Sequence, residues 1–187
     1  GNMEFEDISD TALPEDDHWT AGVSVVDINN DGLMDIYVCK FGPTMDLNKR
    51  KNQLLINRGN NRFRDEAKKY GLDDAGFTTQ TVFFDVDNDG DKDAYVVNQP
   101  PDLKFLKYLG LPKPSAAEKK GIYSDQLYIR NDEGKYENKT KEYGIQNYAH
   151  GLNALVNDIN EDGWLDLYVS NDYEKPDHIY INQKGKG

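Results

Sequence analysis

One twelve-residue pattern occurs three times in this chain and limits the folds that the chain can adopt. Each copy has oxygen-bearing side chains at positions 1, 3, 5 and 9, glycine at position 6, and an apolar-Tyr-Val ending. The copies are residues 27–38, 85–96 and 158–169. β-Branched and aromatic residues flank the first copy on both sides, which favours strands there. The pattern therefore predicts three β-hairpins whose turns are rich in carboxylates.

The spacing of the oxygens is typical of a calcium loop. Calcium takes six to eight oxygen ligands, and glycine at position 6 allows the sharp turn that brings side chains 1, 3, 5 and 9 together. The backbone carbonyl of position 7 can complete the shell. Without a cation, carboxylates this close would repel one another. The alternative is three acidic surface turns that hold no ion.

An EF-hand or dockerin-type loop opens in the same way, but it closes with an acidic residue at position 12, in a helix. Here position 12 is Val38, Val96 or Val169, and the flanks favour strands. We therefore interpret the three loops as hairpin turns.

A larger repeat surrounds each loop. An aromatic-x-Asp or aromatic-x-Asn strand precedes each loop by 22 residues, starting at Phe5, Phe63 and Tyr136, and a Leu-x-Ile or Ile-x-Ile strand follows each loop. One unit thus contains four short strands, which we call A (before the loop), B (after it), C (Leu/Ile-x-Ile) and D (aromatic-x-Asp/Asn). Repeated units of four antiparallel strands indicate the blades of a β-propeller. We divide the single propeller region 1–187 into repeats of about 5–62, 63–135 and 136–187.

Composition excludes some functions. The net charge is −12, the reverse of what a nucleic-acid-binding protein usually carries. No apolar run is long enough for a membrane span. Cys39 is the single cysteine, so no intrachain disulfide can form, and we expect it to be a small buried residue. Gly1-Asn2-Met3 is not a leader, and we expect that a native one has been removed.

The loop pattern, with its upstream Phe-x-Asp and downstream Asn-x-Leu-x-Ile-Asn, resembles the FG-GAP/VCBS repeat proteins, a superfamily that includes integrin α-subunit propellers. The likeness is greatest to secreted proteins that carry such repeats ahead of an ASPIC/UnbV domain. It implies a calcium-stabilised propeller in an extracellular, cell-surface or periplasmic protein that binds a protein or glycan ligand. Carried over by position, with the position-7 carbonyls added, the implied ligands of three Ca²⁺ ions are Asp27, Asn29, Asp31, Leu33 and Asp35; Asp85, Asp87, Asp89, Asp91 and Asp93; and Asp158, Asn160, Asp162, Trp164 and Asp166.

Two of the loops have Asn at position 3, which offers an oxygen but no charge. We therefore expect the loop that begins at Asp85 to bind calcium most tightly. Related propellers have six to eight blades, whereas this chain carries three repeats. We expect either part of a longer propeller or a chain that associates with copies of itself, because bare blade faces need a partner.

Meander topology places the calcium loops at one end of the propeller and the long B–C connections at the other. The connection over residues 99–124 is an insert in which Leu103, Leu106 and Tyr108–Leu109 predict a short helix, and Ser115 a second. The insert is either a cap over the core or a ligand-binding element. Trp19, Phe77 and His150 occupy equivalent positions and either pack at the blade rim or line a sugar site.

No catalytic motif stands out. The leading hypothesis is a binding or adhesion module; the second is a domain of a polysaccharide lyase, with candidate residues Lys40, Lys104, Lys107, His18 and His150; the third is a purely structural segment of a surface protein. The sequon Asn138-Lys139-Thr140 falls on a D strand, so a structural role explains it better than glycosylation.

Overall fold

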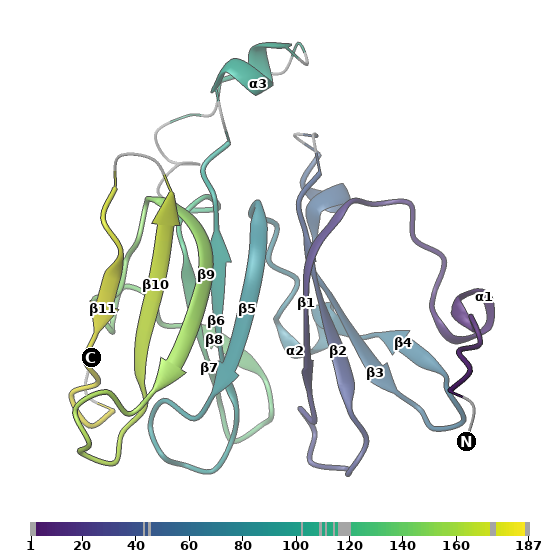
Figure 1. Ribbon diagram of the computed structural model, residues 1–187, viewed down its shortest axis with the longest axis horizontal. Helices are drawn as coiled ribbons and strands as arrows, with labels where there is room; N and C mark the ends of the chain where they lie inside the picture. The colour runs from purple at the N-terminus through teal and green to yellow at the C-terminus, as the bar shows by residue number, and fades with distance from the viewer. Residues whose placement is uncertain are drawn as a thin grey trace.

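The computed structural model describes residues 3–42, 44, 46–101, 103–108, 110, 112–113, 115, 121–172 and 175–185. Three antiparallel sheets stand side by side, and short helices lie in the connections (Figure 1). The predicted all-β class is confirmed, and the sheets have the arrangement expected of propeller blades. We number the blades 1 to 3 from the N-terminus.

Blades 1 and 2 contain the four predicted strands, in the predicted order A-B-C-D. Blade 1 consists of β1 (Thr20–Val26), β2 (Asp35–Lys40), β3 (Gln53–Asn57) and β4 (Phe63–Asp65). Blade 2 consists of β5 (Thr78–Phe84), β6 (Asp93–Asn98), β7 (Gln126–Arg130) and β8 (Tyr136–Asn138).

Blade 3 has three strands among the described residues. They are β9 (His150–Asn157), β10 (Asp166–Asp172) and β11 (His178–Tyr180), and β11 lies at the outer edge. The register of the inner strands repeats: Tyr37 pairs with Ser24, Tyr95 with Val82 and Tyr168 with Leu155. The three Asp-to-Val patterns therefore enter their B strands in the same phase.

The A strands line the inner side of the array, where β1 packs beside β5 and β5 beside β9. Side chains join these strands to neighbouring backbones: the Thr79 hydroxyl donates to the Gly151 carbonyl oxygen at 3.1 Å, and the Ala154 N–H donates to Gln80 Oε1 at 2.7 Å. Gly22 lies so close to β5 that a Cβ there would meet the Thr79 carbonyl oxygen at 2.2 Å.

The hydrophobic core is divided between the two blade–blade interfaces. One cluster joins blades 1 and 2 and includes Val26, Tyr37, Leu54 and Tyr136; the other joins blades 2 and 3. Strand β6 is buried at every position, because a blade covers each of its faces. A single unit could not bury both faces, which is why the units stack.

The helices occupy the connections. They are α1 (Ser9–Ala12), the 3₁₀ helix η1 (Leu47–Arg50), α2 (Ala67–Tyr70) and α3 (Leu103–Tyr108). Helix α3 confirms the first helix predicted in the insert, while residues 116–120, where the second was predicted, lie outside the described part of the chain. Helices α1, α2 and η1 were not predicted.

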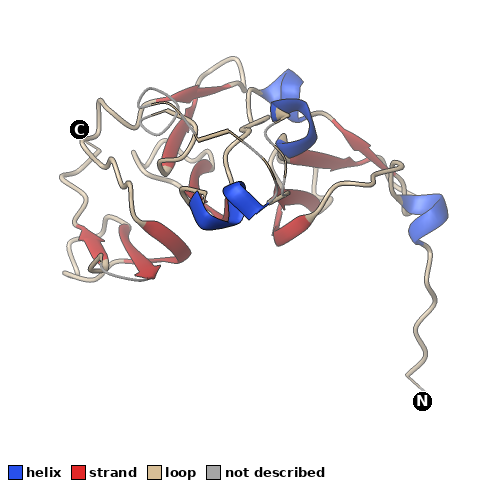
Figure 2. Cartoon of the chain, turned by 90° about the horizontal axis from the view of Figure 1, so that it is seen from above, coloured by secondary structure: helices blue, strands red, loops and turns tan. Residues whose placement is uncertain are grey.

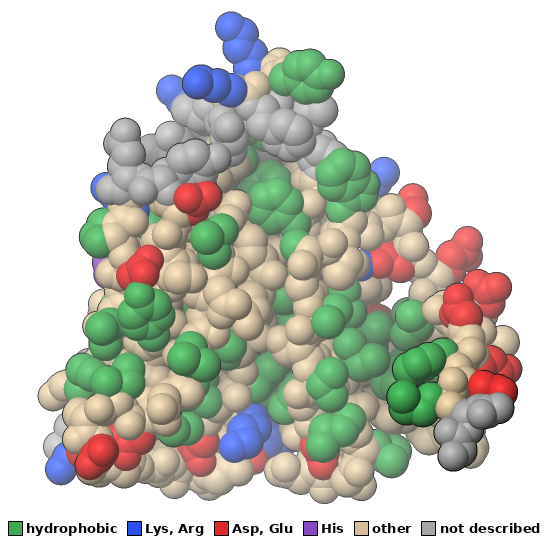
Figure 3. Space-filling view, viewed as in Figure 1, with side chains coloured by type: hydrophobic (Ala, Val, Ile, Leu, Met, Phe, Trp, Pro, Cys, Tyr) green, Lys and Arg blue, Asp and Glu red, His purple; other side chains and the backbone are tan. Residues whose placement is uncertain are grey.

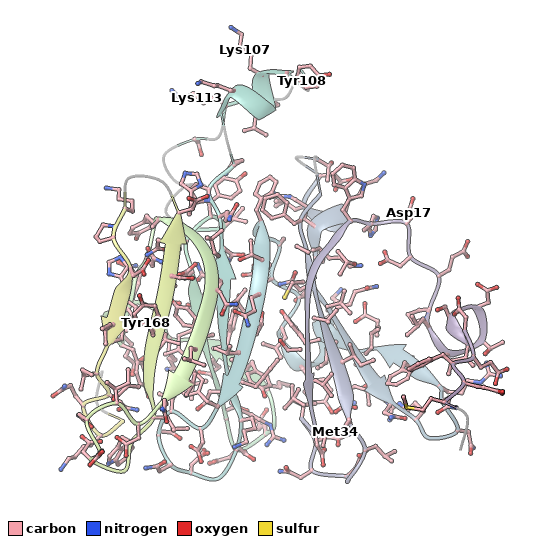
Figure 4. The ribbon with its side chains drawn as sticks, viewed as in Figure 1. Asp17, Met34, Lys107, Tyr108, Lys113 and Tyr168 are labelled. Carbon is pink, nitrogen blue, oxygen red and sulfur yellow. The ribbon has the colours of Figure 1, made fainter. Side chains whose placement is uncertain are left out.

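The two ends of the blades carry different connections (Figure 1). The A–B turns and the C–D turns lie at one end, and α3 projects from the other. The side-chain view places Met34, from the first A–B turn, at the end opposite to Lys107 and Tyr108 of α3 (Figure 4). This confirms the predicted separation of the loops from the long B–C connections.

Candidate metal centre at the A–B turns

The aspartate at position 9 of each loop is a buried anchor for the turn. Asp35, Asp93 and Asp166 are all buried to 1% exposure or less. In each, Oδ2 accepts the backbone N–H of loop position 2, at 3.1, 2.9 and 2.9 Å, and Oδ1 accepts a backbone N–H at or just beyond the end of strand C, at 2.8 Å. One carboxylate therefore ties strands A, B and C together.

The aspartates at positions 1 and 5 fold the turn onto itself. In all three loops the position-1 carboxylate accepts the N–H groups of positions 5 and 6, and the position-5 carboxylate accepts the N–H of position 7. From the first loop to the third, the N–H of position 5 lies 3.1, 3.2 and 3.0 Å from the position-1 carboxylate. The N–H of position 6 lies 2.9, 2.9 and 2.8 Å from the same carboxylate. The N–H of position 7 lies 2.8, 2.8 and 3.0 Å from the position-5 carboxylate. The three loops thus share one hydrogen-bond pattern.

Backbone conformation explains the glycine at position 6. Gly32, Gly90 and Gly163 have φ of 84°, 94° and 88°, which disfavours a side chain. Position 4 is also left-handed, with φ near 60° in Asn30, Asn88 and Glu161. Asn tolerates this region better than most residues. Asn at position 4 of two loops is therefore a sequence signal for the left-handed conformation.

The second loop brings three carboxylates together. Oxygens of Asp85, Asp87 and Asp89 lie within 4.8 Å of one another, and Asp87 Oδ1 is buried with no hydrogen-bond partner among the described residues. Burial and then the charge of Asp89 raise the pKa of Asp87. Burial also raises the pKa of Asp93, to about 7. A buried carboxylate oxygen without a donor, beside two further carboxylates, is a donor set that fits a hard divalent cation.

The first and third loops place the same atoms with an amide at position 3. Asn29 Oδ1 and Asn160 Oδ1 each accept the N–H of position 5 at 3.1 Å, and each amide nitrogen donates to the position-5 carboxylate. Their donor sets carry one charge fewer than that of the Asp85 loop. In the Asp85 loop, by contrast, the Asp91 carboxylate is paired with Arg130, so only its backbone is left for an ion.

At position 7, the N–H groups of Leu33, Asp91 and Trp164 donate to the position-5 carboxylates. The predicted ligands of each loop are therefore gathered in one turn. Which of them contact an ion stays a prediction.

Of the lysine and histidine candidates for lyase chemistry, Lys40 and His18 share the Asp16 carboxylate, and Lys107 lies apart from both. Lys40 is buried and ion-paired with Asp16. His18 Nδ1 lies 3.1 Å from Asp16 Oδ1, and His18 Nε2 lies 3.2 Å from Asp17 Oδ1. Lys107 is exposed at the tip of α3 (Figure 4), on a different element from both.

The three equivalent residues Trp19, Phe77 and His150 do not form an exposed ring. Phe77 is buried against Phe41 and Tyr123, with the guanidinium of Arg50 at 4.0 Å from its ring centroid. Trp19 is 61% exposed. Packing at the rim accounts for Phe77, and Trp19 is left on the surface.

Two smaller expectations also concern single residues. Cys39 is fully buried, and burial raises the pKa of its thiol to about 12, so it is not a reactive thiol. Asn138 ends β8 and donates from Nδ2 to Gln126 Oε1 at 2.6 Å, which gives the sequon residue a structural role.

A second repeated device lies at the other end of the B strands. The side chain of the residue before strand C accepts a backbone N–H from near the end of strand B. Asn52 accepts from Lys40, Asp125 from Asn98, and Asp177 from Asn171, at 2.7, 2.7 and 2.8 Å. The sequence carries a signal for this contact, which is the Asn or Asp at the start of each strand-C motif.

Comparison with known proteins agrees with this geometry. A model of the FG-GAP-like repeat matches residues 1–38 and 45–96, which include the first two loops. No curated protein matches the chain. The likeness to proteins with an ASPIC/UnbV domain is not confirmed by this match and stays a prediction.

The third loop lies beyond the matched residues, and it shares their spacing, strand register and hydrogen bonds. The family model matches blade 1 and the A–B hairpin of blade 2, and the chain belongs to the FG-GAP repeat proteins.

Proposed function

We propose that the chain is a calcium-binding β-propeller module of an extracellular or cell-surface protein, and that it binds a protein or glycan ligand. The observation that carries the calcium proposal is the group of Asp85, Asp87 and Asp89, with its buried Asp87 oxygen, for which the described part of the chain supplies no donor. FG-GAP repeats commonly bind calcium and usually occur in extracellular or surface proteins. Among the described helices, none is long and apolar enough to cross a membrane.

Calcium would hold each turn in the form that the buried position-9 aspartate requires. A cation among the carboxylates of positions 1, 3 and 5 removes their mutual repulsion. Because an ion that binds only the folded protein stabilises it, calcium at 100 times its Kd adds about 2.7 kcal/mol per site. Chelation with EDTA should therefore lower the melting temperature by several degrees.

Calorimetric titration of the chelated protein with Ca²⁺ tests the proposal. We expect binding, with the tightest site weakened toward the affinity of the two loops that have Asn at position 3 in Asp87→Asn, and unaffected in Asp132→Asn, whose carboxylate is exposed in a C–D turn. Absence of binding heat, together with identical melts in calcium and EDTA, would contradict the proposal.

Terbium luminescence locates the third site. Trp164 stands at position 7 of that loop, and Trp19 lies outside all three loops, so excitation of indole should give sensitised Tb³⁺ emission in the wild type and in Trp19→Phe. Trp164→Phe should lose most of the emission. Emission that depends on Trp19 instead would place the ion elsewhere.

The end opposite to the loops supports the ligand-binding part of the proposal. Exposed Tyr108, Lys107 and Lys113 lie at the projecting insert, and the space-filling view shows Lys and Arg side chains gathered at its tip (Figures 3 and 4). Trp19 adds an exposed aromatic ring. A glycan array combined with a lyase assay separates a binding module from an enzyme: binding without product supports the module, and product formation supports the lyase alternative.

A further inference from the structure

The side chain of Asn182 joins two neighbouring A–B turns. We number these turns in chain order as loops 1, 2 and 3, which are residues 27–35, 85–93 and 158–166. From blade 3, Asn182 Nδ2 donates to the carbonyl oxygen of Leu165 in loop 3 at 3.2 Å and to that of Val86 in loop 2 at 2.8 Å. Its backbone N–H donates to Asp166 Oδ1 at 2.8 Å, and its Oδ1 accepts the Gly185 N–H at 2.8 Å. Both the nitrogen and the oxygen of the amide are therefore engaged, which fixes the side chain in this position.

The contact with loop 2 holds the peptide bond that leads into Asp87. Val86 is position 2 of loop 2, and its carbonyl belongs to the peptide group that Asp87 completes. Val86 is buried, and its own N–H donates to Asp93 Oδ2 at 2.9 Å. Asp87 is the residue whose Oδ1 is buried without a hydrogen-bond partner among the described residues. Asn182 thus fixes the backbone directly before the side chain that carries the calcium proposal.

The turn after Asn182 lies against both loops. A Cβ added at Gly185 would lie 3.2 Å from Cα and Cβ of Asp87, at position 3 of loop 2, and 3.2 Å from Cζ3 of Trp164, at position 7 of loop 3. In the view from above, the strands of blade 3 lie toward the C-terminus and those of blade 1 toward the N-terminus, with blade 2 between them (Figure 2). Residues 182–185 therefore connect turns that belong to two separate sheets.

Asn57 occupies the equivalent place in blade 1 and makes the same kinds of contact within its own blade. Its N–H donates to Asp35 Oδ1 at 2.8 Å, and its Nδ2 donates to the Met34 carbonyl oxygen at 3.1 Å. Its Oδ1 accepts the Gly59 N–H at 2.9 Å. Asn57 is therefore a matched reference for what such an asparagine contributes to a single loop.

Blade 2 has an arginine in this place. The Arg130 N–H keeps the contact with Asp93 Oδ1 at 2.8 Å, but its guanidinium pairs with the Asp91 carboxylate of its own loop. The position-8 carbonyl, that of Lys92, instead accepts the Tyr136 hydroxyl. Among the described residues, no hydrogen bond runs from the C–D turn of blade 2 to loop 1. Within that part of the chain the bridge thus joins loops 2 and 3 and is not repeated between loops 1 and 2.

We propose that Asn182 couples the ion sites of loops 2 and 3, so that each ion binds more tightly when the other site is occupied, while loop 1 binds independently. An ion in loop 2 orders Asp87 and the peptide group that Asn182 contacts. Through the same side chain, this order extends to the carbonyl of Leu165 and to Asp166, at positions 8 and 9 of loop 3. The inference deepens the proposed calcium function and rests on it.

The cost of ordering gives the coupling its sign. An ion that orders a segment loses part of its binding free energy, whereas a second ion that binds to the ordered segment does not. Because residues 182–185 contact both loops, they are ordered once for two ions. Coupling of this kind typically changes affinity by about 5- to 150-fold, and it is reciprocal. Asn182 is a positioning residue in this scheme, because it holds backbone groups of the loops.

Terbium emission sensitised by Trp164 measures the coupling at loop 3 alone. In a Trp19→Phe background Trp164 is the only tryptophan, and its sensitised emission gives the Tb³⁺ concentration that half fills loop 3. Asp87→Ala, which weakens loop 2, should raise this concentration at least about fivefold. With Asn182→Ala also present, the same change should shift it less than about twofold, as for independent sites. Asp87→Asn, which keeps the shape of the side chain, should give a smaller shift than Asp87→Ala in the same direction.

Two controls separate the bridge from general effects. Asn57→Ala removes the same kinds of contact from blade 1 and should leave the shift caused by Asp87→Ala intact. Asn29→Ala changes position 3 of loop 1 and should not move the midpoint of loop 3. A shift of equal size with and without Asn182 would overturn the coupling, as would no shift or a shift to lower concentration. Absence of Trp164-sensitised emission from every variant that retains Trp164 would instead contradict the calcium proposal itself, and the coupling with it.

Nuclear magnetic resonance of the side-chain amide reports the bridge directly. The double variant Asp31→Ala with Asp162→Ala removes a predicted ligand from loops 1 and 3 and leaves loop 2 intact. Ca²⁺ should then shift the side-chain amide resonances of Asn182, which contacts loop 2, and leave those of Asn57 unchanged. Unchanged Asn182 resonances beside a shifted Gly90 N–H resonance would show that loop 2 binds without the bridge, and would overturn the proposal.

Discussion

The two ends of the blades are built in opposite ways. At the A–B turn end, each turn consists of nine consecutive residues, and its position-9 carboxylate also accepts one N–H at or just beyond the end of strand C. The same hydrogen bonds recur in all three turns. At the opposite end, one contact recurs, the acceptor that precedes each strand C. The other contacts there join segments far apart in the chain and differ from blade to blade. Arg50 from η1, for example, stacks on Phe77 and Tyr123. The comparison teaches that the turn end is a local motif and the other end is a tertiary assembly.

The difference assigns different kinds of function to the two ends. A turn that directs the N–H groups of positions 2, 5, 6 and 7 at its own carboxylates is suited to hold a cation and to keep the blades in register. An end composed of unrelated connections can differ from blade to blade, as loops on a rigid scaffold do when they carry binding sites. Four changes would break or sharpen this contrast.

The largest effect is expected at the buried anchor of a turn. Asp93→Ala removes the acceptor of two backbone N–H groups, those of Val86 and Arg130. Each buried N–H left without a partner costs about 1–3 kcal/mol, so the loss of unfolding free energy should be about 2–5 kcal/mol. Urea denaturation in EDTA measures it without any contribution from calcium.

Exposed Asp132→Ala is the matched control and should change stability by less than about 0.5 kcal/mol. A loss for Asp93→Ala that disappears in EDTA would mean that the carboxylate acts only through the ion. The turn would then not be the self-contained motif that the hydrogen bonds indicate.

The opposite end has its own large effect at Arg50. The side chain is fully buried, with its guanidinium over the Phe77 ring. Arg50→Ala removes a desolvated cation–π contact, worth about 2 kcal/mol or more, and leaves a cavity. We expect a loss of about 2–4 kcal/mol by urea denaturation. Exposed Lys49→Ala is the control, and an equal, small change in both variants would contradict a structural role for the buried cation.

Sequence alone was enough for the turn end and not for the opposite end, and the residues show why. The turn signal lies within nine positions, from Asp85 to Asp93, so spacing alone predicted the hairpin and the gathered carboxylates. The stack of Arg50, Phe77 and Tyr123 spans more than 70 residues, and nothing in the pattern Lys49-Arg50-Lys51 distinguishes a buried arginine from an exposed one. The double role of Asp93 as an acceptor was also missed, because spacing does not reveal which N–H lies nearby.

The buried Asp125, at the end opposite to the A–B turns, should make the stability of the protein depend on pH. Burial raises the pKa of Asp125 to about 7, even though its carboxylate accepts hydrogen bonds from Asn98, Tyr95 and Asn147. Because this pKa lies above the ordinary aspartate value of about 3.9, the folded state holds the proton more tightly than the unfolded state. Its contribution to stability is complete below pH about 4 and is lost as the pH rises through about 7.

The dependence of stability on pH measures this contribution. Between pH about 4 and 7, one such group adds a slope of up to about 1.4 kcal/mol per pH unit. Asp125→Asn should flatten the slope by that amount in EDTA. An unchanged slope would show that Asp125 is ionised over the whole range in the folded protein.

The smallest effect compares the turns with one another. Position 4 is left-handed in all three, and Asn30 and Asn88 tolerate that conformation better than Glu161. The left-handed region costs most residues about 1–2 kcal/mol and Asn less, so Glu161→Asn should stabilise the protein by about 0.5–1 kcal/mol. Asn88→Glu, the reciprocal change, should destabilise it by a similar amount in urea denaturation. If the two changes differ in size, the three turns are not energetically equivalent, although the hydrogen bonds accepted by positions 1, 5 and 9 are the same in all three.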